Sequence, residues 1–84
     1  MSTEQQVLDY IVENFLFGSG EGLSPSQSLL ESGVVDSTGV MELVLFLEQT
    51  FHIEVADEDL VPENLDSVSN IAGFVDRKLA AAAA

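Results

Sequence analysis

The sequence predicts an all-α protein, a small four-helix bundle with three main helices, one short helix and a long first loop. Three observations predict this fold. The chain has 84 residues, enough for one domain with one thin core. Apolar residues recur at helical spacing in three separate segments. Glycine, serine and proline gather between the first two segments, where they favour a loop. We therefore expect a single domain over residues 1–84, ordered over about residues 3–79.

The first helix is predicted over residues 3–17. Ser2 or Thr3 can cap its N-terminus, because a glutamine follows three residues later in the position of a capping box. Its apolar stripe comprises Val7, Leu8, Ile11, Val12, Phe15 and Leu16. Three glycines then end it: Gly18, Gly20 and Gly22.

The long first loop is predicted over residues 18–35. Its second half is rich in aliphatic residues, which a freely solvated linker would not contain. We expect Leu29, Leu30 and one of the two valines after Gly33 to enter the core. Gly33 supplies a turn that a side chain would hinder.

The second helix is predicted from Ser37 to about His52, with Asp36 as its N-cap. His52, the only histidine, suits the C-terminal end of this helix better than a catalytic role. The core stripe of the helix comprises Val40, Leu43, Val44, Leu47 and Phe51.

The last third of the chain predicts a short helical turn and a final helix. The turn opens at residues 57–59 and carries Leu60 and Val61, and Pro62 ends it or starts the next loop. The final helix runs over about residues 67–79 with Ser67 as its cap. Its stripe comprises Val68, Ile71, Phe74, Val75 and Leu79. The alanines at 80–84 have nothing to pack against, and we expect them to fray.

The composition excludes several classes of function. The formal net charge is −13, from 15 acidic and 2 basic residues, which argues against nucleic acid and anionic membranes as partners. Cysteine is absent, so the chain has no thiol of its own. The acidic residues near position 57 lack the spacing of an EF-hand, and we predict no metal site. No apolar run could span a bilayer and the N-terminus is polar, so we expect a cytoplasmic protein.

The dipeptide Asp36-Ser37 is the strongest candidate site. A helix N-terminus has free backbone N–H groups and the positive end of the helix dipole. An anion attached to the Ser37 hydroxyl would be stabilised there, as phosphates commonly are. The alternative is that both residues only cap the helix.

Residues 31–44, Glu-Ser-Gly-Val-Val-Asp-Ser-Thr-Gly-Val-Met-Glu-Leu-Val, resemble the phosphopantetheine attachment region of acyl carrier proteins. Residues 46–55 resemble the remainder of that family's second helix and the short run that follows. The order and size of the predicted elements are also similar over nearly the whole chain. One departure stands beside the serine. The family usually has leucine there, whereas this chain has Thr38 and then Gly39.

The resemblance implies a carrier protein that is not an enzyme. Ser37 would accept a 4′-phosphopantetheine arm from coenzyme A, transferred by a separate phosphopantetheinyl transferase. The arm would then supply the thiol that carries an acyl group as a thioester. Asp36 would cap the helix and help the transferase engage the site. The run Asp-Ser-Thr-Gly also resembles small freestanding carriers that serve dedicated acyl- or aminoacyl-activating ligases.

An exposed stripe on the second helix is the predicted partner-binding surface. It has an apolar centre with acidic neighbours, which suits basic surfaces on a ligase, an acyltransferase or a synthase. We expect its apolar members to be partly exposed and its acids to face water. The stripe comprises Thr38, Met41, Glu42, Leu45 and Glu48.

We therefore expect a monomeric acyl carrier protein that delivers its cargo to enzymes of lipid or secondary-metabolite biosynthesis. Two alternatives remain open: an aminoacyl or peptidyl carrier loaded by a dedicated ligase, and an acidic interaction module without any modification. We also hypothesise that the interior shelters an acyl chain. The residues expected to line it are Val7, Ile11, Leu43, Leu47, Ile71 and Phe74.

Overall fold

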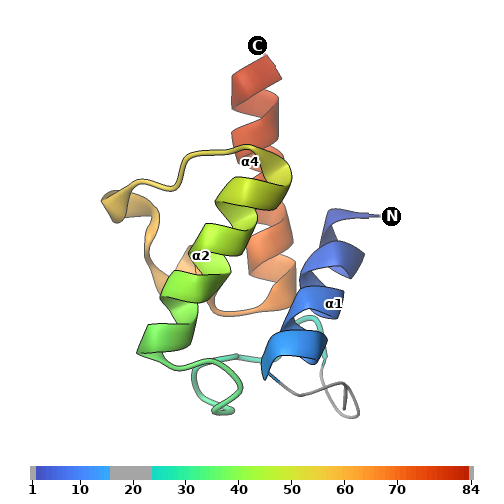
Figure 1. The fold of residues 1–84 in the computed structure, drawn as a ribbon, viewed down its shortest axis with the longest axis vertical. Coiled ribbons are helices and arrows are strands. Elements are labelled where there is room, and N and C mark those ends of the chain that lie inside the picture. Colours follow the sequence, from blue (N-terminus) through green and yellow to red (C-terminus); the bar gives the residue numbers. More distant parts are fainter. Residues whose placement is uncertain (1, 16–23, 84) are drawn as a thin grey trace.

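The computed structural model describes residues 2–15 and 24–83, and within these ranges the chain is helical without strands. The elements are α1 (Thr3–Phe15), α2 (Ser37–Phe51), the 3₁₀ turn η1 (Asp57–Asp59), α3 (Pro62–Leu65) and α4 (Val68–Ala83). α4 packs along α1, and in Figure 1 α2 crosses in front of α4. The predicted all-α bundle is confirmed. None of the described helices is both long and apolar enough to cross a membrane.

α1 begins where the sequence predicts. The Gln5 amide donates to Ser2 Oγ at 3.1 Å, so Ser2 is the capping residue. Thr3 instead ties α1 to α4, because its hydroxyl donates to Asp76 Oδ1 at 3.0 Å. The predicted extension over residues 16–17 and the three glycines expected to end the helix lie outside the described residues.

In the core, the apolar faces of α1 and α2 pack against α4. The fully buried positions confirm most of the predicted stripes. Val40 and Phe51, both predicted to be in the core, are only half-buried. The buried residues of the helices are Val7, Ile11, Gly39, Leu43, Val44, Leu47, Leu65, Val68, Ile71, Ala72, Phe74 and Val75.

The described part of the first loop closes one end of the bundle with two side chains, Leu29 and Val35. Gly33 has a φ of 78°, as the predicted turn requires. The prediction that Leu30 enters the core is wrong, because its side chain is 43% exposed. Asp66 explains the difference. Its carbonyl accepts the Leu29 amide at 2.6 Å and its carboxylate accepts the Leu30 amide at 3.2 Å. With the backbone fixed there, one leucine points inward and the other does not.

The region after α2 contains two short helical elements where the sequence predicted one. η1 ends at Asp59, and α3 then starts at Pro62. Proline suits the first position of a helix because the N–H that it lacks would have no partner there. The prediction that Pro62 ends a helical turn or starts a loop is therefore wrong.

α4 begins at the predicted cap, since the Asn70 amide donates to Ser67 Oγ at 3.0 Å. It continues past the predicted end near residue 79 to Ala83. Alanine has the highest helix propensity of all residues, and this favours helix even without packing partners. Leu79, predicted to be in the stripe, is exposed, because the last turns of α4 project beyond the other helices (Figure 1).

Candidate cofactor-attachment site

The attachment site predicted from the sequence lies at the start of α2. Asp36 is the N-cap, with φ −102° and ψ −176°. Its Oδ1 atom accepts the Gly39 amide at 2.7 Å, and its carbonyl accepts the Val40 amide at 2.9 Å. The predicted capping role of Asp36 is confirmed. This cap fixes the backbone conformation of the turn that carries Ser37.

Ser37 is the first residue of α2 and is exposed to solvent. Within the described residues, its hydroxyl takes part in no hydrogen bond of the structure. The first turn of α2 contains no acidic residue, and the N-terminal end of a helix dipole is positive. A phosphodiester on this hydroxyl would find room, solvent and a favourable field. The residues present therefore fit an attached phosphate group.

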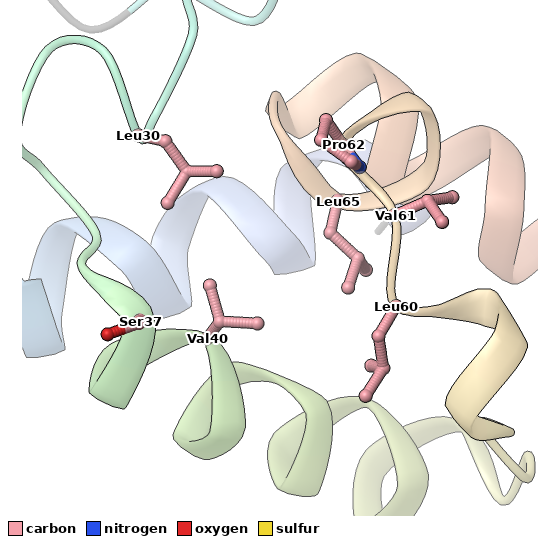
Figure 2. Close-up of a pocket in the computed structure, with 7 residues that line it drawn as sticks. All are labelled: Leu30, Ser37, Val40, Leu60, Val61, Pro62 and Leu65. Atoms are coloured by element: carbon pink, nitrogen blue, oxygen red, sulfur yellow. The ribbon is translucent and has the colours of Figure 1, made fainter.

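An apolar pocket of about 260 Å³ lies beside Ser37. Figure 2 shows Ser37 at one edge of this pocket, with aliphatic side chains from three parts of the chain around a common space. One comes from the first loop, one from α2 and the others from the segment between η1 and the end of α3. The lining residues are Leu30, Ser37, Val40, Leu60, Val61, Pro62 and Leu65.

Most of this pocket was not predicted from the sequence. The residues expected to line an acyl shelter in the interior are all buried in the core, and none of them lines this pocket. The missed residues are the exposed Leu30 and those that lie on or next to α3, whose start at Pro62 was not predicted. A proline preceded by two apolar residues is the only local signal that could have indicated this side of the pocket.

The predicted partner-binding stripe is exposed over most of its length. Met41 and Leu45 are 56% and 54% exposed, and Thr38 and Glu42 are exposed beside them. Glu48 differs from the expectation, because it is half-buried and its Oε2 atom accepts the Val55 amide at 3.0 Å. Its carboxylate ties α2 to the segment that follows and does not simply face water.

The other polar candidates have structural partners. His52 is the C-cap of α2 in a left-handed conformation with φ 56°, as its predicted capping role requires. Asp59 pairs with Lys78, whose Nζ atom lies 2.8 Å from Oδ2. The hydrogen bond from Lys78, together with that from the Ala56 amide, lowers the pKa of Asp59. In residues 2–15 and 24–83, acidic and histidine side chains do not gather into a set of three that could hold a metal ion.

Comparison with known proteins agrees with this geometry. A family model described as "Phosphopantetheine attachment site" matches residues 5–75. The probable acyl carrier protein PigG of Serratia sp. is 30% identical over 74 residues, covering 88% of this chain and 85% of that protein. The acyl carrier protein of Bdellovibrio bacteriovorus is 30% identical over 83 residues, with 93% and 96% covered.

A solved structure has the same fold. The solution structure of a holo acyl carrier protein from Nitrosomonas europaea superposes with a TM-score of 0.78. It is 24% identical in sequence, and the match covers 95% of this chain and 99% of that chain.

A helical bundle with an exposed serine at a capped helix start, beside an apolar pocket, is the architecture of a carrier, which holds a substrate for other proteins. The family match and the relatives extend over most of the chain. The chain belongs to the acyl carrier protein family. It is therefore a non-enzymatic carrier whose cofactor is covalently attached 4′-phosphopantetheine. Carriers of this kind interact with phosphopantetheinyl transferases and with biosynthetic enzymes.

Proposed function

We propose that Ser37 is the attachment residue. Its hydroxyl oxygen attacks the β-phosphorus of coenzyme A, adenosine 3′,5′-bisphosphate leaves, and the hydroxyl proton is released. The product is a phosphodiester at the N-terminus of α2. The observation that carries this proposal is the position of Ser37: exposed, next to the Asp36 cap, and at the edge of an apolar pocket.

The arm supplies the thiol that the chain itself lacks. An acyl group joins this thiol as a thioester, and the carrier delivers it to enzymes of lipid or secondary-metabolite biosynthesis in the cytoplasm. The carrier works as a monomer, because it must pass from one enzyme to the next.

The pocket beside Ser37 favours an acyl cargo over an aminoacyl one. Its lining is aliphatic apart from Ser37, so it would stabilise a hydrocarbon chain and would oppose a charged ammonium group. The acyl chain would enter the pocket between the side chains of Val40 and Leu60. The hydrophobic core of the bundle would not open. The sequence Thr38-Gly39 keeps the aminoacyl carrier as the second candidate, because it resembles carriers that dedicated ligases load. An unmodified interaction module leaves both the family match and the exposed serine without a role.

Partner enzymes would dock on the stripe of Thr38, Met41 and Leu45, with Glu42 beside it. The exposed apolar centre would give a small contact area. The acidic surroundings would speed the encounter with a basic surface without making the complex long-lived. Glu48 lies at the edge of this stripe and contributes less, because its carboxylate already binds the Val55 amide.

The attachment is tested by intact mass. The wild type and a Ser37→Ala variant are incubated with coenzyme A, magnesium and a broad-specificity phosphopantetheinyl transferase. The wild type should gain one phosphopantetheine arm and the variant none. A Ser69→Ala variant is the matched control, since it removes another exposed serine hydroxyl, on α4, and should still be modified. An unmodified wild type, under conditions that modify a known carrier, would refute the proposal.

The cargo is tested by carbon and proton chemical shifts. Loading holo protein with an octanoyl group should change the chemical shifts of Val40 and Leu60. Loading it with an alanyl group should not change them. Equal spectra for both cargoes in this pocket would contradict the preference for acyl groups.

A further inference from the structure

Gly39 occupies a tight contact two residues after Ser37. It is buried on α2, and a Cβ atom at this position would lie 2.7 Å from Phe15 Cε1. The same Cβ would lie 3.3 Å from the capping oxygen Oδ1 of Asp36. Glycine in a helix is ordinarily destabilising relative to alanine. The structure assigns Gly39 a packing role, since only glycine lets the Phe15 ring and the Asp36 cap meet the same turn.

The Phe15 ring also contacts another aromatic side chain. Phe15 is the last residue of α1, and its ring meets Tyr10 edge-on, with centroids 6.0 Å apart and planes at 72°. Tyr10 in turn stacks on Phe46 of α2, with centroids 3.9 Å apart and planes at 13°. A side chain at position 39 would therefore displace the Phe15 ring, and with it the aromatic contacts that link α1 to α2.

The contact lies behind the attachment residue. Successive residues of an α-helix are turned by about 100° around its axis, so positions 37 and 39 are about 200° apart. Phe15 thus supports the buried side of the turn whose solvent side carries Ser37. We propose that Gly39 and Phe15 are positioning residues for the modification. Their contact holds Asp36 and Ser37 in the orientation that the transferase uses. This inference rests on Ser37 being the attachment residue.

The test is the kinetics of phosphopantetheinylation by the same transferase, with coenzyme A and magnesium. Gly39→Ala should lower kcat/KM for the carrier by roughly tenfold or more, because small misplacements of a reacting group have large effects on rate. The assays are run at a temperature at which circular dichroism shows every variant folded. Gly73→Ala is the matched control: it also lies within a helix, and its Cβ would be 3.5 Å from Arg77 Nη1, an ordinary contact. It should leave kcat/KM unchanged.

A second substitution distinguishes positioning from general destabilisation. Phe15→Leu removes the ring atom that the added methyl group at position 39 would meet, so the double variant Gly39→Ala/Phe15→Leu should recover most of the lost kcat/KM. Phe15→Leu alone should lower kcat/KM less than Gly39→Ala does. If Gly39→Ala does not fold, the double variant must fold and be modified, and its failure would overturn the proposal.

Two further outcomes would also overturn it. One is a folded Gly39→Ala protein with the kcat/KM of the wild type. The other is a loss of kcat/KM that Phe15→Leu does not restore. Both differ from a failure of the proposed attachment, in which the wild type itself is not modified or Ser37→Ala still is.

Discussion

The two sides of the pocket beside Ser37 are held by different forces. On the α2 side, the pocket residue Val40 lies on the same helix face as Leu43 and Leu47, which are fully buried. On the opposite side, Leu65 is buried, but Leu60 and Val61 are half-buried, as Val40 is. The difference teaches that the α2 side is fixed mainly by apolar burial, whereas the opposite side relies on polar ties as well.

Those ties use both basic residues of the chain. Lys78 Nζ lies 2.8 Å from Asp59 Oδ2 and 5.7 Å from the centroid of the Phe74 ring. Arg77 Nη2 donates to Asn64 Oδ1 at 3.0 Å, and Asn64 donates to the Asp59 carbonyl at 3.0 Å. In an acidic chain, the two cations thus fasten the segment that carries η1 and α3 onto α4. This is the side of the pocket that we expect to yield when cargo enters.

The largest expected effect compares a leucine on each side. Leu47→Ala should lower the free energy of unfolding by about 2–5 kcal/mol, because it leaves a cavity in a closed core. Leu60→Ala should lower it by less than half as much, since its half-buried site can collapse or fill with water. Urea unfolding followed by circular dichroism measures both.

If Leu47→Ala does not fold, the milder pair Leu47→Val and Leu60→Val replaces it, and the loss should again be larger at Leu47. A loss for Leu60→Ala as large as that for Leu47→Ala would show that the two sides are equally anchored and would contradict the comparison.

The next effect compares the caps that begin α2 and α4. Asp36→Ala removes the cap of α2, and Ser67→Ala removes the cap of α4, directly after α3. Each should lower the free energy of unfolding by about 1 kcal/mol. Only Asp36→Ala should also slow phosphopantetheinylation, because only this cap lies beside Ser37. An equal slowing by Ser67→Ala would mean that stability, and not local geometry, controls the reaction.

The sequence predicted the α2 side of the pocket far better than the opposite side. Asp36, the core stripe and the exposed Met41 follow from local rules on caps and helical periodicity. The opposite side depends on long-range contacts that have no local signal. Leu29 and Leu30 are adjacent aliphatic residues, and only the distant Asp66 decides which of them is buried. In the same way, no rule on glycine in helices could show that Gly39 faces Phe15.

A smaller effect tests the ionic tie. Lys78→Met keeps the apolar stem and removes the charge, so the segment of η1 should open more often. Amide hydrogen exchange at Leu60, whose N–H donates to the Asp57 carbonyl, should become faster than in the wild type. The difference should shrink as sodium chloride is raised, because salt screens the pair at this partly exposed site. Exchange at Leu43, on the α2 side, is the internal reference and should change less. A difference that is independent of salt would contradict the ionic character of this tie.

The smallest effect concerns acid, and its sign follows from the pKa of Asp59. The hydrogen bond from Lys78 lowers this pKa below its ordinary value of 3.8. The stabilisation is therefore present above the unfolded pKa and is lost as the pH falls through the lower, folded-state pKa. Carboxyl carbon shifts measured by NMR should show Asp59 titrating at a lower pH in the wild type than in Lys78→Met. Because the fully buried leucines of the α2 side take no part in the tie between Asp59 and Lys78, their methyl shifts should stay constant over the pH range in which those of Leu60 change. A simultaneous change on both sides would mean that acid opens the whole bundle and not one side of the pocket.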